Sequence, residues 1–430
     1  MTEITRYILR FMTGEHLPDD ISRFVGYTSD RSSFPDYKVV IIPSGFFEEG
    51  SYGTAKTKPP IPPGHIEGVP FLYGTPDVER VGDTVVVHAD LVASAYFLLS
   101  RYEEVLHRDI RDEHGRFPGR ESLPRRAGFI DRPVVDEYGR LIRGWLGSAG
   151  VPRQELVPFI RKVNLTCDID VPFTGRTWRS VAGKILSGRH PVAAVREKYA
   201  PLEENPYYTF PWMLEQNRKL QCAMGEERCR ILFFFRAGGK TRQDRPRYDP
   251  GGKDIRSLFS LCRRYGAEVG LHSSYQAGKE PSLILSEKRR LEEAFEMEIT
   301  QNRHHFLTAR EPEHMEYLEA AGITDDYTMG YADVAGFRLG TALPVRYINP
   351  VTRRLSALRL HPLTVMDSTL NEVKYMNLTR DRAEEYCMRL IGNTRNVNGE
   401  LTLLWHNTST IERSGYLRRL YVVLTAKLAE

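Results

Sequence analysis

Short apolar runs that alternate with helical patterns constrain the fold of this chain more than any other feature. From residue 163 onward, polar residues border each of five such runs, which read VNLTCDID, RILFFF, AEVGLHS, RHHFL and LTLLWHN. Between them lie long helical patterns with an apolar face and a charged back, such as ILSEKRRLEEAFEMEI. Strands that are apolar on both faces and separated by helices are typical of a parallel sheet covered by helices. An open doubly wound sheet and a (β/α) barrel both satisfy this pattern.

The first 150 or so residues have a different texture. Strand-like runs at 38–42 and 84–87 flank a loop rich in proline and glycine, and helices are expected over about 89–104 and 133–146. Two glycines and a proline after the second helix mark a boundary. We therefore expect a smaller amino-terminal α/β accessory domain over residues 1–155 and a second domain over 156–430. The charged stretch 108–129 is expected to be a solvated loop.

Charge and cysteine content exclude several classes of protein. Sixty basic and 56 acidic residues leave a net charge of +4, which gives no argument for a nucleic-acid or membrane-surface partner. Five cysteines without a C-x-x-C pair predict reduced thiols rather than a disulfide framework or a zinc knuckle. The amino terminus lacks the apolar core of a signal peptide, and we expect no membrane span and a cytoplasmic protein. The oligomeric state is unknown at this point.

Polar side chains follow the predicted strands at their carboxyl ends, where parallel sheets and barrels gather their ligands. They are Asp168, Asp170, His272, Ser273, Ser274, Arg303, His304, His305 and His406, with Asp326 in a further polar patch. Carboxylates and imidazoles on one rim are the ligand and acid/base set of a mononuclear metal hydrolase. Taken alone, Asp168 or Asp170 can also be explained as a helix cap, because an aspartate after a strand often has that role. His272 taken alone can also be explained as a hydrogen-bonded structural histidine. The D-x-D spacing favours function, because two close carboxylates repel unless a cation or an arginine lies near.

The ordered set D-x-D, H-S, R-x-H and H resembles the polysaccharide deacetylase family (carbohydrate esterase family 4), over about residues 163–410. The phrases FLLSRYEE, RDEHGRF, RPVVDEYG, NPYYTFPWML and GYADVAGFRLGT are similar to those of a bacterial branch with a separate amino-terminal domain. This resemblance implies a catalytic domain that is a distorted (β/α) barrel. It also implies a metal-dependent hydrolase that removes N- or O-acetyl groups from a carbohydrate, with a divalent ion such as zinc as cofactor.

The resemblance assigns a role to each matching residue. Asp168 would be the general base and His406 the general acid, with Arg303 tuning the base and Asp326 holding that arginine. Asp170 and His272 would bind the metal, with Gln276 at the position of the family's second metal histidine. The substrate would meet Leu404, Trp405, His305, Ser273 and Tyr208. For Tyr208, packing at a helix start is an alternative to stacking on sugar.

Two departures from the family pattern affect the metal site. Ile169 separates the two aspartates, which are adjacent in the family, and Gln276 replaces a histidine. An amide oxygen is a weaker ligand for zinc-like ions than imidazole, so we expect weak metal binding unless His304 or His305 substitutes from the next strand end. Two other functions remain open. One is a C–N hydrolase that acts on a non-sugar amide, and the other is a barrel without metal that binds glycan or a partner protein. The basic loop after ILFFF is either a solvated connection or a rim that binds an anionic or hydroxyl-rich substrate.

Overall fold

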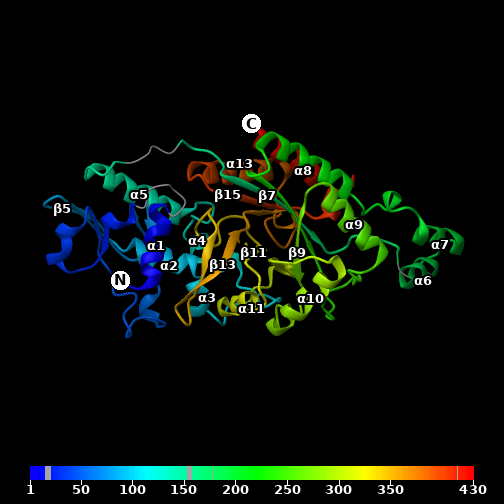
Figure 1. Ribbon diagram of the computed structural model, residues 1–430, viewed down its shortest axis with the longest axis horizontal. Coiled ribbons are helices and arrows are strands. Elements are labelled where there is room, and N and C mark those ends of the chain that lie inside the picture. Colours follow the sequence, from blue (N-terminus) through cyan, green and yellow to red (C-terminus); the bar gives the residue numbers. More distant parts are fainter. Residues whose placement is uncertain (15–20, 153–156, 177, 414) are drawn as a thin grey trace. The chain divides into compact units, whose positions relative to one another are not determined.

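The computed structural model describes residues 1–14, 21–152, 157–176, 178–413 and 415–430, which form two compact units (Figure 1). Unit 1 consists of Met1–Arg161, Phe306–Thr364 and Arg389–Leu401, and unit 2 of Lys162–His305, Val365–Met388 and Thr402–Glu430. The domain boundary predicted between residues 155 and 156 lies outside the described residues. The assignment of the two domains therefore stays a prediction.

A parallel sheet forms the centre of unit 2, as the sequence predicts. Its strands run in the order β10-β9-β8-β7-β15-β14, with parallel pairing between β10 and β9, β9 and β8, β8 and β7, and β15 and β14. The strands are β7 (Lys162–Ile169), β8 (Cys229–Phe235), β9 (Glu268–Ser273), β10 (Gln301–His304), β14 (Val365–Met366) and β15 (Glu400–Leu404). Within the described part of unit 2 this order does not close into a barrel.

Burial on both faces explains why these strands are so apolar. Phe233, Phe234 and Phe235 are successive residues of β8, and all three are fully buried. Successive side chains of a strand point to opposite faces, so helices must cover the sheet on both sides. The helices of this unit are α6 (Trp178–Leu186), α7 (Pro191–Tyr199), α8 (Phe210–Met224), α9 (Lys253–Arg264), α10 (Ile284–Phe295), α12 (Asp367–Asn371), α14 (Leu417–Ala429) and the first half of α13 (Arg380–Asn396).

Unit 1 contains a separate four-stranded sheet in the order β1-β2-β6-β5. Its strands are β1 (Val25–Tyr27), β2 (Val39–Ile41), β6 (Thr84–Ala89) and β5 (Gly74–Val81), and the expected strands at 38–42 and 84–87 are β2 and β6. The other elements are the β3 (Gly64–Ile66) and β4 (Val69–Phe71) hairpin, β11 (Asp325–Met329), β12 (Val345–Asn349), β13 (Arg354–Pro362), α1 (Glu3–Thr13), α2 (Leu91–Leu99), α3 (Tyr102–Leu106), α4 (Leu123–Arg126), α5 (Val134–Ser148) and α11 (Glu316–Ala320). The helix expected over 89–104 is two helices, because Arg101 has a left-handed backbone with φ of 61°.

The charged stretch 108–129 is not the solvated loop that its composition predicts. Phe117 is buried against Ile130, Tyr331 and Val334. Several of its charges are paired, since the Arg116 guanidinium lies 2.7 Å from the Asp112 carboxylate and the Arg111 guanidinium lies 2.9 Å from Glu311. Paired charges can accompany apolar neighbours into a core, which a count of charged residues does not reveal.

The cysteines and helices agree with the simpler expectations. All five cysteines are free thiols, four of them buried and Cys222 exposed. No helix in the described ranges combines the length and apolarity needed to cross a bilayer.

Candidate functional site

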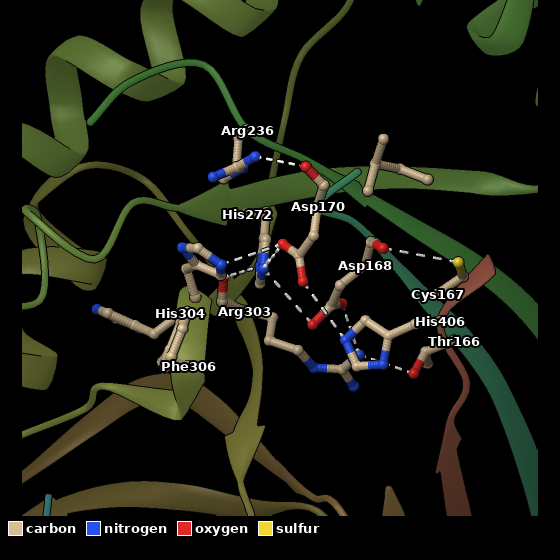
Figure 2. Close-up of polar contacts among 12 residues, drawn as sticks. Thr166, Cys167, Asp168, Asp170, Arg236, His272, Arg303, His304, Phe306 and His406 are labelled. Carbon is tan, nitrogen blue, oxygen red and sulfur yellow. Dashed lines mark hydrogen bonds and ion pairs between the residues drawn. The ribbon is translucent and has the colours of Figure 1, made fainter. Parts of the chain in front are cut away.

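Three side chains, from β7, β9 and β10, meet at the carboxyl edge of the unit 2 sheet, and Figure 2 shows Asp170 and His272 pointing toward one another. Asp170 follows β7, His272 lies near the end of β9, and His305 follows β10 directly. The Asp170 Oδ1 atom is 3.2 Å from His272 Nε2 and 3.2 Å from His305 Nε2. The parallel register positions them, because corresponding ends of parallel strands share one edge of a sheet.

The second nitrogen of each imidazole has an acceptor as its partner. His272 Nδ1 is 2.9 Å from the Arg303 carbonyl oxygen, and His305 Nδ1 is 3.4 Å from Asp244 Oδ1. Carbonyl and carboxylate oxygens only accept hydrogen bonds, so these partners assign the proton to Nδ1 in both rings. In the neutral form of either ring, Nε2 then presents a lone pair towards Asp170, whereas a protonated ring offers an N–H to the carboxylate. A histidine fixed through its outer nitrogen in this way is typical of metal ligands.

Unsatisfied polar atoms show that the cluster fits a cation. Among the described residues, Asp170 Oδ1 and His272 Nε2 are buried and form no hydrogen bond. Buried polar atoms in proteins nearly always have a partner. Two ligand atoms each bonded to one zinc-like ion at about 2.1 Å with tetrahedral angles lie roughly 3.4 Å apart, close to the spacing observed here. The Asp170, His272 and His305 set therefore fits a divalent cation in donor type and in spacing.

The charge of Asp170 is held in place by its surroundings. Burial alone would raise the pKa of this carboxyl, but the nearby His305, His272 and Arg236 hold it well below its usual range. Arg236, the first residue after β8, donates from Nη2 to the Asp170 backbone carbonyl at 2.6 Å and to the Pro246 carbonyl at 2.7 Å. Asp170 is thus an anion whose backbone carbonyl is held by Arg236.

Asp168 lies beside this cluster, within β7 and two residues before Asp170. Its Oδ1 accepts from Arg303 Nη1 at 3.0 Å, and its Oδ2 is 3.6 Å from His272 Nε2 (Figure 2). Arg303 is fully buried, lies 4.7 Å over the Phe234 ring and also donates to Thr166 Oγ1 at 2.7 Å. The arginine therefore fixes one carboxylate oxygen of Asp168 and leaves the other facing the cluster.

His406 completes the site from the end of β15. Its Nδ1 donates to Asp367 Oδ1 at 2.8 Å, and its Nε2 is 3.5 Å from Asp170 Oδ2. Burial alone would lower the pKa of His406, but the charge of Asp367 and the hydrogen bond to it, followed by Asp170 and Asp168, raise that pKa to about 10. The imidazole is therefore protonated at neutral pH and presents an N–H to the site.

Gln276 lies outside this cluster. Its Oε1 accepts from the Lys240 backbone N–H at 3.0 Å, and its Nε2 donates to Glu280 at 3.5 Å. No polar contact in the described part of the chain joins Gln276 to Asp170 or His272. The third member of the cluster is His305, which the sequence offered as a substitute ligand and also as a residue of the substrate groove.

The remaining predicted residues lie as follows. The Ser273 hydroxyl donates to the Asn302 side chain. Leu404 and Trp405 are fully buried, and the Trp405 indole N–H donates to the Leu417 carbonyl at 3.2 Å. Tyr208 is half-buried, and its ring centroid lies 5.9 Å from that of Phe173 and 5.6 Å from that of Phe210. Asp326 belongs to unit 1, where it accepts from the Thr328 backbone N–H at 3.0 Å and from its hydroxyl at 2.7 Å.

Three supporting residues escaped the sequence analysis. Arg236 directly follows β8, and the strand-end argument that selected Asp168 applies to it equally. Asp367 directly follows β14, but that strand has only two residues and leaves no apolar run to notice. Asp244 lies in the basic loop after β8, at a distance from the strand end where no pattern marks it.

Known proteins match only parts of this chain. Residues 2–150 match a protein family of unknown function, DUF7033. No curated protein matches the sequence. Among solved structures, a protein assigned as a polysaccharide deacetylase from Mycobacterium smegmatis is similar at 14% identity and a TM-score of 0.38, covering 64% of this chain and 89% of that one.

Two further structures are similar at the same level. The Puue allantoinase has 14% identity and a TM-score of 0.37, and the match covers 64% of this chain and 91% of the allantoinase chain. A mutant of BA3943, a CE4-family pseudoenzyme with restored enzymatic activity, has 13% identity and a TM-score of 0.31, covering 66% of this chain and 74% of its own. At these TM-scores the likeness carries no information about function.

Proposed function

We propose that this protein is a metal-dependent hydrolase that removes an N- or O-acetyl group from a carbohydrate. The observation that carries the proposal is the meeting of the Asp170 carboxylate with two imidazole Nε2 atoms, beside the Asp168 carboxylate and the protonated His406. Hydrolysis of an amide or ester needs an activated water, stabilisation of the oxyanion and a proton for the leaving group. Asp168 and His406 are present for the water and the leaving group, and a cation held by the ligand cluster would stabilise the oxyanion.

Asp170, His272 and His305 would hold the metal. When bound, a divalent cation polarises the substrate carbonyl and lowers the pKa of a water from about 16 to about 7. Asp168 would take the proton of the attacking water through Oδ2, because Arg303 already occupies its Oδ1. Arg303 also orients this carboxylate, since its guanidinium is fixed by Thr166 and by the Phe234 ring.

His406 would supply the proton for the leaving group. Its Nδ1–H is engaged by Asp367, so the proton available to a substrate is the one on Nε2. The high pKa of His406 keeps that proton in place before the reaction, and the positive charge of a bound cation would lower this pKa towards the range of an efficient acid. Asp367 is therefore a positioning residue for the acid.

The finer assignments remain part of the proposal. They are a distorted (β/α) barrel as the catalytic domain, Asp326 as a support for Arg303, and Leu404, Trp405, Ser273 and Tyr208 as neighbours of the substrate. A C–N hydrolase that acts on a non-sugar amide would use the same ligands, base and acid, and differs only in what the groove accepts. His305 weighs against a metal-free binding protein, because it provides the imidazole that Gln276 does not.

Metal analysis and acetate release test the proposal together. The purified protein is dialysed, its metal content is measured, and acetate release is assayed with acetylated oligosaccharides and an aryl acetate in the presence of zinc, cobalt, nickel or manganese. We expect metal-stimulated release that Asp168→Asn abolishes without loss of bound metal, whereas Asp249→Asn at an exposed position of the same unit has no effect. Absence of metal-stimulated release from a broad panel of acetylated substrates and amides would overturn the proposal.

A further inference from the structure

The connection between β7 and α8 carries a helical hairpin that the proposed reaction does not use. It consists of α6 and α7, which lie side by side (Figure 1). Val181 of α6 and Ala194 of α7 are buried. Asn205 closes its base, because its side chain accepts from the Thr174 backbone N–H at 3.2 Å and donates to the Thr174 carbonyl at 2.7 Å. We call residues 176–199, which hold both helices, the α6–α7 hairpin; two acidic residues, Glu203 and Glu204, lie between it and α8.

Large apolar side chains of this hairpin are exposed. Sixteen large apolar residues of the described chain are exposed, and five of them lie within these two short helices. They are Trp178 at 60%, Ile185 at 36%, Leu186 at 89%, Val192 at 69% and Tyr199 at 64%. Scattered apolar residues on a surface need no explanation, but a concentration of this kind indicates an interaction surface.

Helical periodicity places four of these five side chains on one face of their helix, and Leu186 follows Ile185 at the end of α6. Trp178 and Ile185 are seven residues apart in α6, and Val192 and Tyr199 are seven residues apart in α7. Seven residues are close to two helical turns, so each pair shares a face. The Trp178 and Tyr199 ring centroids are 6.2 Å apart, which joins the two faces across the hairpin.

The same hairpin is strongly basic. Residues 176–199 contain six lysines and arginines and one glutamate, a net charge of +5, although the whole chain has a net charge of only +4. The glutamate, Glu197, pairs with Lys184 and lies 3.5 Å from Arg189. Arg179 and Arg196 are exposed, and no ion pair to either is found in the described part of the chain.

Cations and apolar groups are intermixed at one end of the hairpin. The Lys198 ammonium lies 4.7 Å from the Trp178 ring centroid and 3.9 Å from the Tyr199 ring centroid. Aromatic rings beside basic residues are typical of elements that lie in the interface of a membrane, where rings sit at the headgroup level and cations meet lipid phosphates. An apolar face alone would suit a protein partner, but an excess of five positive charges is complementary to an anionic lipid surface.

We propose that the α6–α7 hairpin docks this protein peripherally on a membrane surface rich in anionic lipids. Trp178, Leu186 and Val192 would enter the boundary between headgroups and acyl chains, while Arg179, Arg189 and Arg196 would contact phosphates. The hairpin follows Asp168 and Asp170 directly in the chain, on the carboxyl side of β7. Docking would therefore bring the candidate site towards substrates carried on that surface.

Vesicle sedimentation with the full chain tests this proposal. We expect the protein to sediment with vesicles that contain phosphatidylglycerol and to remain in solution with pure phosphatidylcholine, and added salt should release it. Arg179→Glu combined with Arg196→Glu should weaken partitioning at least about five-fold for each charge removed. Leu186→Ser combined with Val192→Ser should weaken it roughly ten-fold. Activity on a soluble aryl acetate and the circular dichroism spectrum should not change.

Matched controls and a local reporter complete the test. Val373→Ser removes an apolar side chain that is 84% exposed elsewhere in unit 2, and Arg256→Glu reverses an exposed charge on α9, so both should bind vesicles normally. Trp178 is the most exposed of the four tryptophans. The tryptophan emission of the protein should therefore shift to the blue on binding, and this shift should be absent in Trp178→Phe. The proposal is overturned if anionic vesicles do not retain the protein, if controls and hairpin variants bind alike, or if the hairpin variants instead abolish self-association or nucleic-acid binding.

Discussion

His406 and Asp367 are joined twice, since the imidazole Nδ1 lies 2.8 Å from Asp367 Oδ1 and the His406 backbone N–H donates to Asp367 Oδ2 at 2.7 Å. Asp367 is fully buried, and burial alone would raise the pKa of this carboxyl, but the charge of His406 and these hydrogen bonds lower it. The pair is therefore an ionised carboxylate and an imidazolium with one orientation. This relationship makes His406 a proton donor through Nε2.

Removal of the Asp367 charge should change the pH dependence of turnover. The pKa of His406 is raised to about 10 in the free protein, with Asp367 as the main cause that raises it. A general acid must be protonated, so activity should fall as pH rises through the His406 pKa of the metal-bound protein, which the cation would place below that of the free protein. Asp367→Asn should move the alkaline limb of kcat/KM to lower pH by roughly one to three units, because a neighbouring anion shifts a pKa by that much. An unmoved alkaline limb in a folded variant would show that His406 is not the acid.

The leaving group provides a separate test of the same histidine. His406→Ala should reduce turnover strongly for substrates with poor amine or alcohol leaving groups and much less for an activated aryl acetate, whose leaving group departs without a proton. The measurement compares kcat on both substrates in the two proteins. Equal losses on both would indicate a structural role for His406.

Metal affinity should depend on His305 and not on Gln276. His305→Ala removes one of the three cluster ligands, and competition with a chelator should show a loss of at least about 100-fold in zinc affinity, whereas Gln276→Ala should leave affinity unchanged. Asp244→Asn should weaken affinity about 10–100-fold, as is typical for the loss of an outer partner of a ligand histidine. If Gln276→Ala loses as much zinc affinity as His305→Ala, Gln276 is a metal ligand and the prediction is wrong.

The buried Arg303 and Asp168 should be coupled in stability. Arg303→Met leaves the buried Asp168 without its cation and should cost about 3–5 kcal/mol in the free energy of unfolding. Asp168→Asn removes the charge that needs pairing, so Arg303→Met should cost clearly less in that background. Urea denaturation of the four proteins in this cycle measures the coupling. Additive effects would mean that the pair does not interact as its 3.0 Å contact indicates.

The sheet and most of the site were predictable because apolar strands and their polar ends are visible in one dimension. β7, β8 and β9 appear as short, mainly apolar runs, and Asp168, Asp170 and His272 lie at or near the ends of β7 and β9. Parallel pairing then brings them together without further information. The same reasoning selected His305 as a neighbour, although it could not decide between a ligand and a wall of the groove.

Partners that arrive through loops were not predictable. Asp244 reaches His305 because the loop after β8 folds back, where it accepts from the Tyr275 backbone N–H at 2.8 Å and from Thr241 at 2.6 Å. No periodicity encodes such a path. The helix break at Arg101 escaped for a related reason, since an arginine with positive φ is set by its surroundings and not by its own preference.

The acid Glu287 on α10 should make unit 2 less stable at alkaline pH. Its Oε2 accepts from the Ser274 backbone N–H at 2.9 Å and its Oε1 from the Ser274 hydroxyl at 2.5 Å. Burial raises the pKa of Glu287 to about 7, Asp244 adds to this, and the Ser274 bonds only partly oppose it. The folded-state pKa lies above the ordinary value of 4.5, so its favourable contribution is complete below pH 4.5 and is lost as pH rises through about 7.

Glu287→Gln should therefore stabilise the protein at pH 8 and not at pH 4.5. The shift corresponds to at most about 3 kcal/mol in the free energy of unfolding. The glutamine amide can keep both contacts, because its oxygen accepts from the Ser274 N–H and its nitrogen donates to the Ser274 hydroxyl oxygen. Urea denaturation at the two pH values measures the difference, with Glu293→Gln at an exposed position of α10 as the control for loss of a helical glutamate. An equal effect of Glu287→Gln at both pH values would show that Glu287 is ionised in the folded protein throughout this range.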